Sequence, residues 1–298
     1  MRHLLSIEKL TRPEIDQMLA HALVLKRERG HHAHRPLTGQ IWAMLFSKAS
    51  TRTRVSFEVG IRELGGDVLF LPASEIQLGR GEPIKDTARV LGRMVHGAVF
   101  RTYAQADVEE FANYAKIPTI NALTDEEHPC QILADILTFQ EKRGPIQGRV
   151  VTFIGDGACN VANSWIFAAS RLGFELRIAA PAGFQPPAAL VKRAGGKVIC
   201  TEDIRGAAKD CDLIYTDVWV SMGKEKESAE RLASLQGYQV NSGVVKLGRP
   251  DVLVMHCLPA YRGKEIDEET FEANAQTIFD QAENRLHAQK AVLDWLVC

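Results

Sequence analysis

Short apolar runs alternate with amphipathic segments along nearly the whole chain. The first amphipathic segment, Thr11–Arg29, has apolar residues at helical spacing, begins with a threonine suited to cap a helix, and stops before Gly30. The apolar runs that follow predict strands, and the segments between them have the spacing typical of helices. In the first half we predict strands at Ile41–Phe46, Val68–Leu71, Ala98–Arg101 and Thr119–Ala122, and helices at Thr51–Leu64, Ile84–Met94, Val108–Ala115 and Gln131–Arg143.

The same alternation restarts after Arg143-Gly144-Pro145, a sequence typical of a turn. Here we predict strands at Val150–Ile154, Glu175–Ala179, Lys197–Cys200, Leu213–Thr216, Val252–His256 and Thr277–Phe279, and helices at Ala162–Leu172, Pro187–Ala194, Ile204–Lys209 and Glu283–Val297. Strands that alternate with helices in this way predict parallel sheets with helices on both faces. The pattern therefore indicates the α/β class, with two doubly wound parallel-sheet domains of similar size that join near residues 131–144.

Composition narrows the class of protein further. The chain has 298 residues with a formal net charge of −1, which does not favour nucleic-acid binding because that normally needs a basic surface. No apolar run approaches the roughly 18 residues needed to cross a bilayer, and the charged N-terminus does not resemble a secretory signal. The six cysteines are scattered without a C-x-x-C pair, so we expect reduced thiols in a cytoplasmic protein.

The segment STRTR, residues Ser50 to Arg54, combines hydroxyls and guanidiniums between a predicted strand and a predicted helix. Helix N-termini favour anions, and charge-assisted hydrogen bonds from arginine add to that preference. The segment therefore predicts a phosphate cradle, although a serine cap followed by solvated arginines remains the alternative. It is not a P-loop, because the sequence G-x-x-x-x-G-K-[ST] does not occur.

Further polar residues follow strands of the same half, where open parallel sheets bind their ligands. Arg101 ends one strand, and His128 and Gln131 open the helix that leads to the second half. A lone arginine here would more often form a surface salt bridge, and a lone histidine is usually structural. Together with STRTR, however, these side chains predict one convergent site in which Gln131 recognises an amide and His128 donates to a carbonyl oxygen.

The second half has its own candidates at strand ends. The sequence Gly155–Asn160 resembles a dinucleotide fingerprint but lacks its third glycine, and no acid ends the next strand, so we do not predict NAD binding. Asp217, which is followed by Ser221-Met222-Gly223, either holds an ammonium group or caps an ordinary loop. Cys257, in His256-Cys257-Leu258-Pro259, either presents a thiol at the sheet edge or lies in the core.

A histidine cluster, His31-His32-Ala33-His34, follows Gly30. No acid or cysteine lies near it in the sequence at the spacing of metal ligands. We therefore interpret the cluster as part of a polar loop and predict no metal site there.

Four motifs together, STRTR, HPCQ at 128–131, DVWVSMG at 217–223 and HCLP at 256–259, resemble those of the ornithine carbamoyltransferase family in order and spacing. The resemblance extends over essentially the whole chain. STRTR and HP-x-Q are shared with aspartate carbamoyltransferases, whereas DVWVSMG and HCLP are the ornithine-type signals. The chain departs from the family at Cys159, where members commonly carry the first of two paired asparagines.

The resemblance implies that residues 1–132 bind carbamoyl phosphate, that 133–282 bind ornithine, and that a terminal helix at about 283–298 packs back on the first domain. An active-site cleft would lie between the domains. The carbamoyl-phosphate site would comprise Ser50, Thr51, Arg52, Thr53, Arg101, His128, Gln131, Cys257, Leu258 and Arg285, with Gln77 presented by an adjacent subunit. The resemblance therefore also implies a homotrimer, or a multiple of it.

Ornithine would be held by Asn160, Asp217, Ser221 and Met222. The resemblance implies that Arg101, His128, Asp217 and Cys257 carry the reaction, in which the δ-amine of ornithine attacks carbamoyl phosphate and gives citrulline and phosphate. Carbamoyl phosphate is already activated, so no metal and no organic cofactor is expected. The direction, arginine biosynthesis or its reverse, stays open.

Two alternatives remain for function. A related carbamoyltransferase would act on another amine, such as putrescine or an N-acylornithine. A protein of another class would bind carbamoyl phosphate without turnover and regulate a partner. The second alternative predicts loss of Arg52, Arg101, His128 or Cys257, and all of these residues are present.

Overall fold

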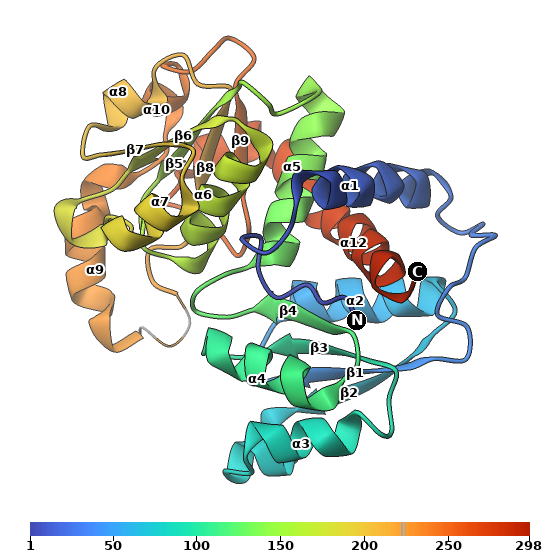
Figure 1. The fold of residues 1–298 in the computed structure, drawn as a ribbon. Coiled ribbons are helices and arrows are strands. Elements are labelled where there is room, and N and C mark those ends of the chain that lie inside the picture. Colours follow the sequence, from blue (N-terminus) through green and yellow to red (C-terminus); the bar gives the residue numbers. More distant parts are fainter. Residues whose placement is uncertain (222, 224) are drawn as a thin grey trace. The chain divides into compact units, whose positions relative to one another are not determined.

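The computed structural model describes residues 1–221, 223 and 225–298. The chain forms two compact units, which we describe separately (Figure 1). Unit 1 comprises Met1–Leu137 and Glu283–Cys298, and unit 2 comprises Thr138–Ala282. Within the described ranges, every helix is too short or too polar to be a membrane span.

Unit 1 contains a four-stranded parallel sheet in the order β2-β1-β3-β4. Its elements are α1 (Arg12–Arg27), β1 (Ile41–Phe46), α2 (Thr51–Glu63), β2 (Asp67–Pro72), the 3-10 turns Ala73–Glu75 and Gln77–Arg80, α3 (Ile84–Leu91), β3 (Gly97–Arg101), α4 (Gln105–Ala115), β4 (Thr119–Leu123), and parts of α5 (Pro129–Arg143) and α12 (Ala275–Val297). The predicted strands and helices of this half are confirmed, with boundaries that differ by a few residues.

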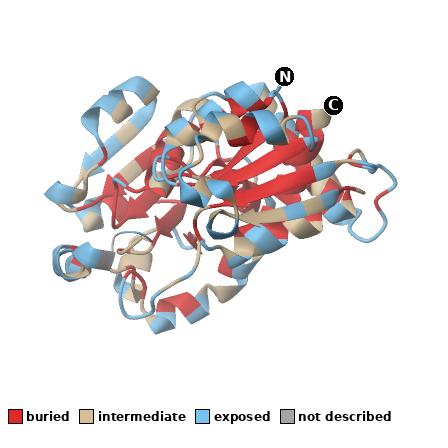
Figure 2. Cartoon of the chain, turned by 90° about the horizontal axis from the view of Figure 1, so that it is seen from below, coloured by how far each residue is buried: buried red, intermediate tan, exposed pale blue. Residues whose placement is uncertain are grey.

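Helices cover both faces of the unit 1 sheet because its central strands are apolar on both sides. On one face, Leu45 and Phe100 pack in a core cluster with Val108 and Phe111 of α4. Elsewhere α2 packs closely on α12: a Cβ added to Gly60 would lie 3.1 Å from the Lys290 side chain. The strands are largely buried in Figure 2, and β2, at the sheet edge, is more exposed than β1.

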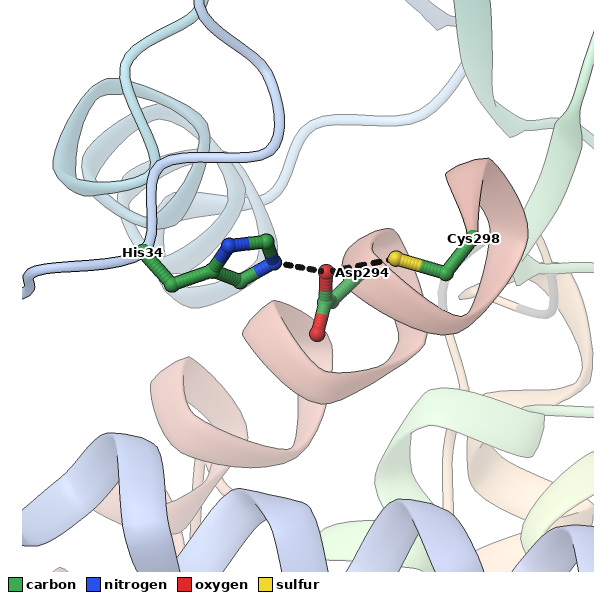
Figure 3. A group of neighbouring side chains, drawn as sticks. All are labelled: His34, Asp294 and Cys298. Atoms are coloured by element: carbon green, nitrogen blue, oxygen red, sulfur yellow. Dashed lines mark hydrogen bonds and ion pairs between the residues drawn. The ribbon is translucent and has the colours of Figure 1, made fainter.

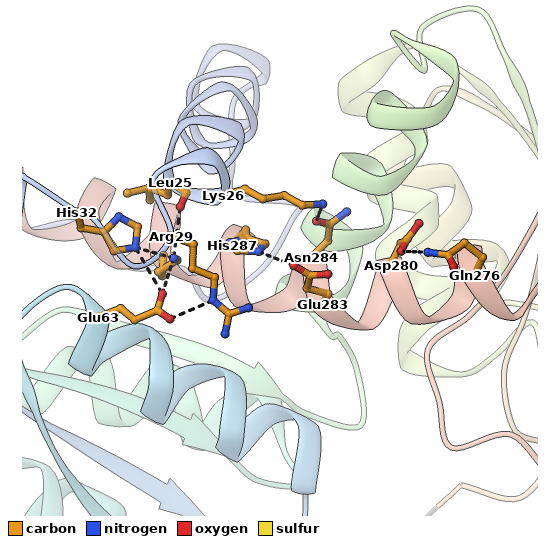
Figure 4. A network of polar contacts seen from close by, with 11 residues as sticks. Leu25, Lys26, Arg29, His32, Glu63, Gln276, Asp280, Glu283, Asn284 and His287 are labelled. Carbon is orange, nitrogen blue, oxygen red and sulfur yellow. Dashed lines mark hydrogen bonds and ion pairs between the residues drawn. The ribbon is translucent and has the colours of Figure 1, made fainter.

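A polar network holds α12 in unit 1 (Figure 4). Lys290 Nζ lies 2.6 Å from Glu63 Oε2 of α2 and 3.0 Å from His32 Nε2, and Arg29 reaches the same carboxylate at 3.2 Å. Burial lowers the pKa of Lys290, an effect that Glu63 opposes. His32 is buried. The interpretation of the histidine cluster as a simple polar loop is therefore wrong for His32, because the fold brings Glu63 and Lys290 to it.

Replacing Lys290 with methionine should destabilise the protein by about 3 kcal/mol, because it leaves the Glu63 carboxylate partly buried without its shortest cationic contact. Urea unfolding followed by circular dichroism would measure the loss. The double variant Glu63→Gln/Lys290→Met should recover part of it, since no charge is then left behind. A single variant as stable as the parent would contradict this account of the network.

Unit 2 contains a five-stranded parallel sheet in the order β7-β6-β5-β8-β9. Its elements are β5 (Val150–Ile154), α6 (Asn160–Leu172), β6 (Glu175–Ala179), α7 (Ala188–Ala194), β7 (Lys197–Thr201), α8 (Ile204–Ala208), β8 (Leu213–Thr216), α9 (Ser228–Leu235), α10 (Ser242–Val245), β9 (Leu253–His256) and α11 (Glu268–Ala273). The two parallel sheets confirm the predicted α/β class with two parallel-sheet domains.

One predicted strand is wrong. Thr277–Phe279 lies inside α12, which begins at Ala275, eight residues before the predicted start of that helix. The segment is rich in residues favoured in strands, but it is short and continues into a helical sequence. Ile278 is fully buried while Phe279 is 55% exposed, so the helix buries one residue of the pair against the core. Tertiary packing here outweighs local strand propensity. The short helices α9, α10 and α11 were not predicted.

Candidate active site

The candidate site in unit 1 begins at the carboxyl end of β1, where the strand order reverses between β1 and β3. Ser50 precedes α2 in an extended conformation, and its Oγ accepts a hydrogen bond from the Thr53 N–H at 3.3 Å. Thr51 is exposed, Arg52 is half-buried and Thr53 is buried. Because first-turn N–H groups lack partners within their own helix, this end of α2 suits an anion such as phosphate.

Guanidinium groups from three elements meet at this end of the sheet. Arg101, at the end of β3, pairs in register with Phe46 at the end of β1. Arg285 of α12 donates from Nη2 to Thr53 Oγ1 at 2.6 Å. Burial, together with the charges of Arg285 and Arg52, lowers the pKa of Arg101 to about 10. Arg101 therefore stays charged at neutral pH, and the mutual repulsion of the cluster would be relieved by a bound polyanion.

His128 is buried beside this cationic cluster. Burial, followed by the charges of Arg285 and Arg101, holds its pKa well below the usual range for histidine. The imidazole is therefore neutral at pH 7. A neutral imidazole can donate one N–H to a carbonyl oxygen without adding to the positive charge of the cluster.

Gln131 lies one turn into α5 and is almost completely buried. Its Nε2 donates to Asp135 Oδ1 at 2.8 Å. Among the described residues, its Oε1 has no hydrogen-bond partner, and neither does the buried Nε of Arg101. Buried polar atoms rarely lack partners. The pair of open positions, one acceptor and one donor, suits a ligand that carries both an N–H and an oxygen.

In unit 2, the buried Asp217 and the half-buried Cys257 form a pair at the ends of β8 and β9. Asp217 Oδ1 accepts hydrogen bonds from Cys257 Sγ at 2.8 Å and from the Val218 N–H at 2.7 Å. Burial raises the pKa of Asp217, although His256 and the bond from Cys257 oppose the shift. Strands β5 and β8 flank the reversal of strand order in this sheet, so Asp217 lies where such sheets bind ligands.

The loop after β9 is shaped by His256, a residue that sequence reasoning left without a role. His256 Nδ1 accepts from the Leu258 N–H at 2.8 Å, and Nε2 lies 3.2 Å from the buried Glu265 carboxylate. Leu258 has a left-handed backbone with φ 58° and precedes a cis bond to Pro259. His256, which contacts Glu265, thus holds the backbone directly after Cys257. Only the position of His256 at a strand end could have indicated this from the sequence.

Cys159, the residue at which this sequence departs from the family pattern, is the N-cap of α6. Its Sγ accepts a hydrogen bond from the Ala162 N–H at 3.4 Å and lies 4.0 Å from Asp217 Oδ2. Burial, and then the charges of Asp217 and Asp156, raise its pKa well above the ordinary value. The group is therefore a thiol at neutral pH. Asn160 follows it in the first turn of α6 and is half-buried.

Asp156, in the glycine-rich turn after β5, is paired inside unit 2. Its carboxylate forms a buried ion pair with Arg231 of α9, and Arg231 Nε also donates to the Trp219 carbonyl at 2.8 Å. The Asp156 carboxylate therefore has a structural role as the partner of Arg231. Through Arg231, it links the glycine-rich turn to Trp219 and to α9.

Three further residues that the sequence predicted for the site are not part of either group described above. Gln77 is exposed in a 3-10 turn of unit 1, and no described contact relates it to the cationic cluster. Ser221 is half-buried in unit 2, and Met222 lies outside the described residues. The roles predicted for these residues in a neighbouring subunit and in ornithine binding stay predictions.

Asp217, His256 and Cys257 also place ligand atoms within 4.8 Å of one another, the spacing of a metal site. Both ring nitrogens of His256 are engaged, however, with the Leu258 N–H and with Glu265. The histidine therefore has no lone pair to offer in this arrangement, and we assign no metal to the group.

The fold and these two groups of residues define a class of protein. Residues 2–141 match the family model described as aspartate/ornithine carbamoyltransferase, carbamoyl-P binding domain, and residues 147–296 match the Asp/Orn binding domain of the same family. The chain therefore belongs to the aspartate/ornithine carbamoyltransferase family.

Within that family the chain is similar to proteins named for ornithine. It is 56% identical over 296 residues to the ornithine carbamoyltransferase of Akkermansia muciniphila, with 98% of this chain and 97% of the relative covered. Among solved structures, the ornithine carbamoyltransferase of Pyrococcus furiosus is 46% identical with a TM-score of 0.92, covering 98% of this chain and 96% of that one. The anabolic enzyme of Campylobacter jejuni is 41% identical with a TM-score of 0.94 and 99% of each chain covered.

Proposed function

We propose that this protein is an ornithine carbamoyltransferase, which transfers the carbamoyl group of carbamoyl phosphate to the δ-amine of ornithine and releases citrulline and phosphate. The observation that carries the proposal is the cluster of Arg52, Arg101 and Arg285 at one strand-order reversal, with a neutral His128 beside it. The buried Asp217 carboxylate, beside the reversal of the second sheet, and the half-buried Cys257 thiol that donates to it supply the complementary half.

In this proposal the phosphate binds at the N-terminus of α2, held by Ser50, Thr51, Arg52 and Thr53. Arg101 and His128 donate to the carbonyl oxygen, on which negative charge develops during attack. Gln131 Oε1 accepts from the carbamoyl N–H, which suits its open acceptor position. Arg285 positions Thr53 through their 2.6 Å hydrogen bond and adds positive charge.

Ornithine is proposed to bind unit 2 through Asn160, Asp217, Ser221 and Met222, and Cys257 and Leu258 are proposed to contact the carbamoyl group. The δ-ammonium must lose a proton before its lone pair can attack the carbonyl carbon. The new C–N bond then forms, and the C–O bond to phosphate breaks with its electron pair on phosphate. The reaction requires the amine bound by unit 2 to reach the carbonyl carbon bound by unit 1.

We further propose a homotrimer or a multiple of it, in which Gln77 serves the site of an adjacent subunit, and a cytoplasmic location. The exposed position of Gln77 and the similarity to ornithine carbamoyltransferases over the full chain support the first proposal. The six free cysteines support the second, because reduced thiols are typical of that compartment.

A substrate panel tests the proposed function. The purified protein, given carbamoyl phosphate, should carbamoylate ornithine at least about tenfold faster, in kcat/KM, than putrescine, N-acetylornithine or aspartate. Putrescine and N-acetylornithine lack one or both of the free α-amino and carboxylate groups that the site is proposed to hold, and aspartate lacks the δ-amine. Comparable turnover of putrescine or N-acetylornithine would establish the related carbamoyltransferase instead. Binding of carbamoyl phosphate without turnover of any amine would establish the silent homologue.

A further inference from the structure

A second group of chemically reactive side chains lies in unit 1, away from the residues proposed for carbamoyl transfer. His34 lies in the loop between α1 and β1, Asp294 lies on α12, and Cys298 directly follows that helix. All three point toward one another in Figure 3. His34 Nε2 is 3.1 Å and Cys298 Sγ is 3.2 Å from the same atom, Asp294 Oδ1.

The other oxygen of this carboxylate is also engaged. His21 Nε2, on α1, lies 2.5 Å from Asp294 Oδ2. The Asp294 carboxylate therefore joins side chains from α1, from the following loop and from the end of α12. The expectation that the histidine cluster lacks an acid and a cysteine at ligand spacing holds along the chain but is wrong in space, because the fold brings both to His34.

The ligand types and their spacing fit zinc. Imidazole nitrogen, thiolate sulfur and carboxylate oxygen are the donors that Zn²⁺ takes in proteins, with bonds of about 2.0–2.3 Å. Tetrahedral bonds of that length separate ligand atoms by about 3.3–3.7 Å. The three atoms here lie within 4.8 Å of one another, with two separations only slightly below the tetrahedral range. These two separations need shifts of only a few tenths of an ångström to admit an ion, and the third, between His34 Nε2 and Cys298 Sγ, lies within 4.8 Å.

We propose that His34 Nε2, Asp294 Oδ1 and Cys298 Sγ bind one zinc ion, and that His21 orients the carboxylate through Oδ2. Outer contacts to ligating carboxylates are typical of metal sites, and His21 Nε2 makes a close polar contact at 2.5 Å without hydrogen-bond geometry. The thiol of Cys298 loses its proton to solvent when it binds. Water completes the four-coordinate site, because the His34 side chain is 59% exposed and leaves the ion accessible.

The group formed by His34, Asp294 and Cys298 differs from the group formed by Asp217, His256 and Cys257 in how its histidine is engaged. There, both nitrogens of the histidine ring are engaged by an N–H donor and a carboxylate. Here, the His34 nitrogen and the Cys298 sulfur converge on one carboxylate oxygen, so a cation could replace the protons that now lie between them. The alternative without metal is a carboxylate shared by two histidines and a thiol at the end of a helix.

Zinc at this position would link two segments of unit 1 that are far apart in the sequence. It would tie the loop after α1 to the end of α12, the helix that also carries Arg285. Because the site exists only in the folded chain, bound metal would stabilise the folded state according to its concentration relative to Kd. The proposal does not depend on the proposed catalytic function.

The experiment uses the full chain with Cys257→Ser, which removes the thiol of the other candidate group. Zinc is titrated against a chromogenic chelator, and Co²⁺ is added as a spectroscopic substitute. We expect one equivalent of metal, a thiolate-to-cobalt absorption band and visible bands typical of tetrahedral Co²⁺. Adding Cys298→Ser should abolish the thiolate band. Cys298→Ser or His34→Ala should each weaken zinc binding at least tenfold, since loss of an outer contact alone costs about 10–100-fold.

Two matched controls locate the effect. Cys200→Ser removes another exposed thiol, and His31→Ala removes an exposed histidine of the same cluster; neither should change affinity or the cobalt spectrum. Zinc should also raise the thermal midpoint of the parent chain but not of the Cys298→Ser chain. Absence of a thiolate band in the folded parent would overturn the proposal, as would zinc binding that Cys298→Ser and His34→Ala leave unchanged.

Discussion

Arg101→Ala should lower kcat by about 10²–10³-fold while leaving the fold intact, which is the loss expected when one donor to a developing oxyanion is removed. Arg101 is 4% exposed and its Nε lacks a hydrogen-bond partner among the described residues, so replacing the side chain breaks no hydrogen bond made by this atom. Its positive charge is held in place despite repulsion from Arg52 and Arg285. The carbonyl oxygen would therefore lose its main charged donor in the transition state.

Steady-state rates of citrulline formation at saturating substrates, with circular dichroism as a check on folding, measure this effect. Arg54→Ala is the matched control. Arg54 belongs to the same STRTR segment, but it is exposed, lies over the Phe70 ring at 3.6 Å and pairs with Glu58. It should retain nearly full activity. Arg101→Lys should recover little, because a lysine cannot reproduce the planar fork of the guanidinium. Turnover of Arg101→Ala close to the parent rate would rule out the proposed role.

Asp217→Asn should raise KM for ornithine by about 100-fold and leave KM for carbamoyl phosphate nearly unchanged. The substitution keeps the shape of the side chain but removes the negative charge that is proposed to hold an ammonium group, and a hydrogen bond to a charged group contributes about 1.5–3 kcal/mol. It also weakens the contact by which the Cys257 thiol is positioned, a hydrogen bond of 2.8 Å. Because Asp217 is proposed to contact ornithine directly and the carbamoyl group only through Cys257, the effect should fall mainly on the KM for ornithine.

The pH dependence of kcat/KM for ornithine gives a second test of the role proposed for Asp217. Because burial raises its pKa and the charged form is the one proposed to bind ornithine, kcat/KM for ornithine should fall as the solution is acidified through a pKa above the ordinary aspartate value of about 3.9. This acid limb should disappear in Asp217→Asn. Asp210→Asn is the control, since Asp210 is exposed before the same strand and has a left-handed backbone that asparagine tolerates. Equal ornithine KM values in Asp217→Asn and the parent would contradict the assignment.

Much of the fold could be predicted from the sequence because strand and helix periodicity is a local property. The strands at Val150–Ile154, Glu175–Ala179 and Leu213–Thr216 match the structure residue for residue. The strand predicted at Thr277–Phe279 is wrong because local periodicity does not decide the structure of this segment. A short segment has too few residues for its period to be decided, and burial of Ile278 in the core selects a helix there.

For the candidate site, the sequence could identify several residues but not their protonation states. The order of strands and helices identified Arg101, His128 and Asp217, because residues after parallel strands gather at one edge of a sheet. The protonation states of these groups could not be predicted. The pKa of Arg101 and of His128 depends first on burial and then on neighbouring charges, and one of those charges, Arg285, comes from the far end of the chain.

By itself, the sequence determined two parallel α/β sheets, the strand ends at which polar residues gather, and the motifs that place the chain in its family. Those features depend on residue type and on spacing over a few positions. Only the tertiary structure decided that Arg285 bonds to Thr53, that Glu265 engages His256, and that His34 meets Asp294 and Cys298. The physical reason is that each of these contacts joins residues that are not neighbours in one element, so packing of the core decides which polar groups meet and how far they are removed from water.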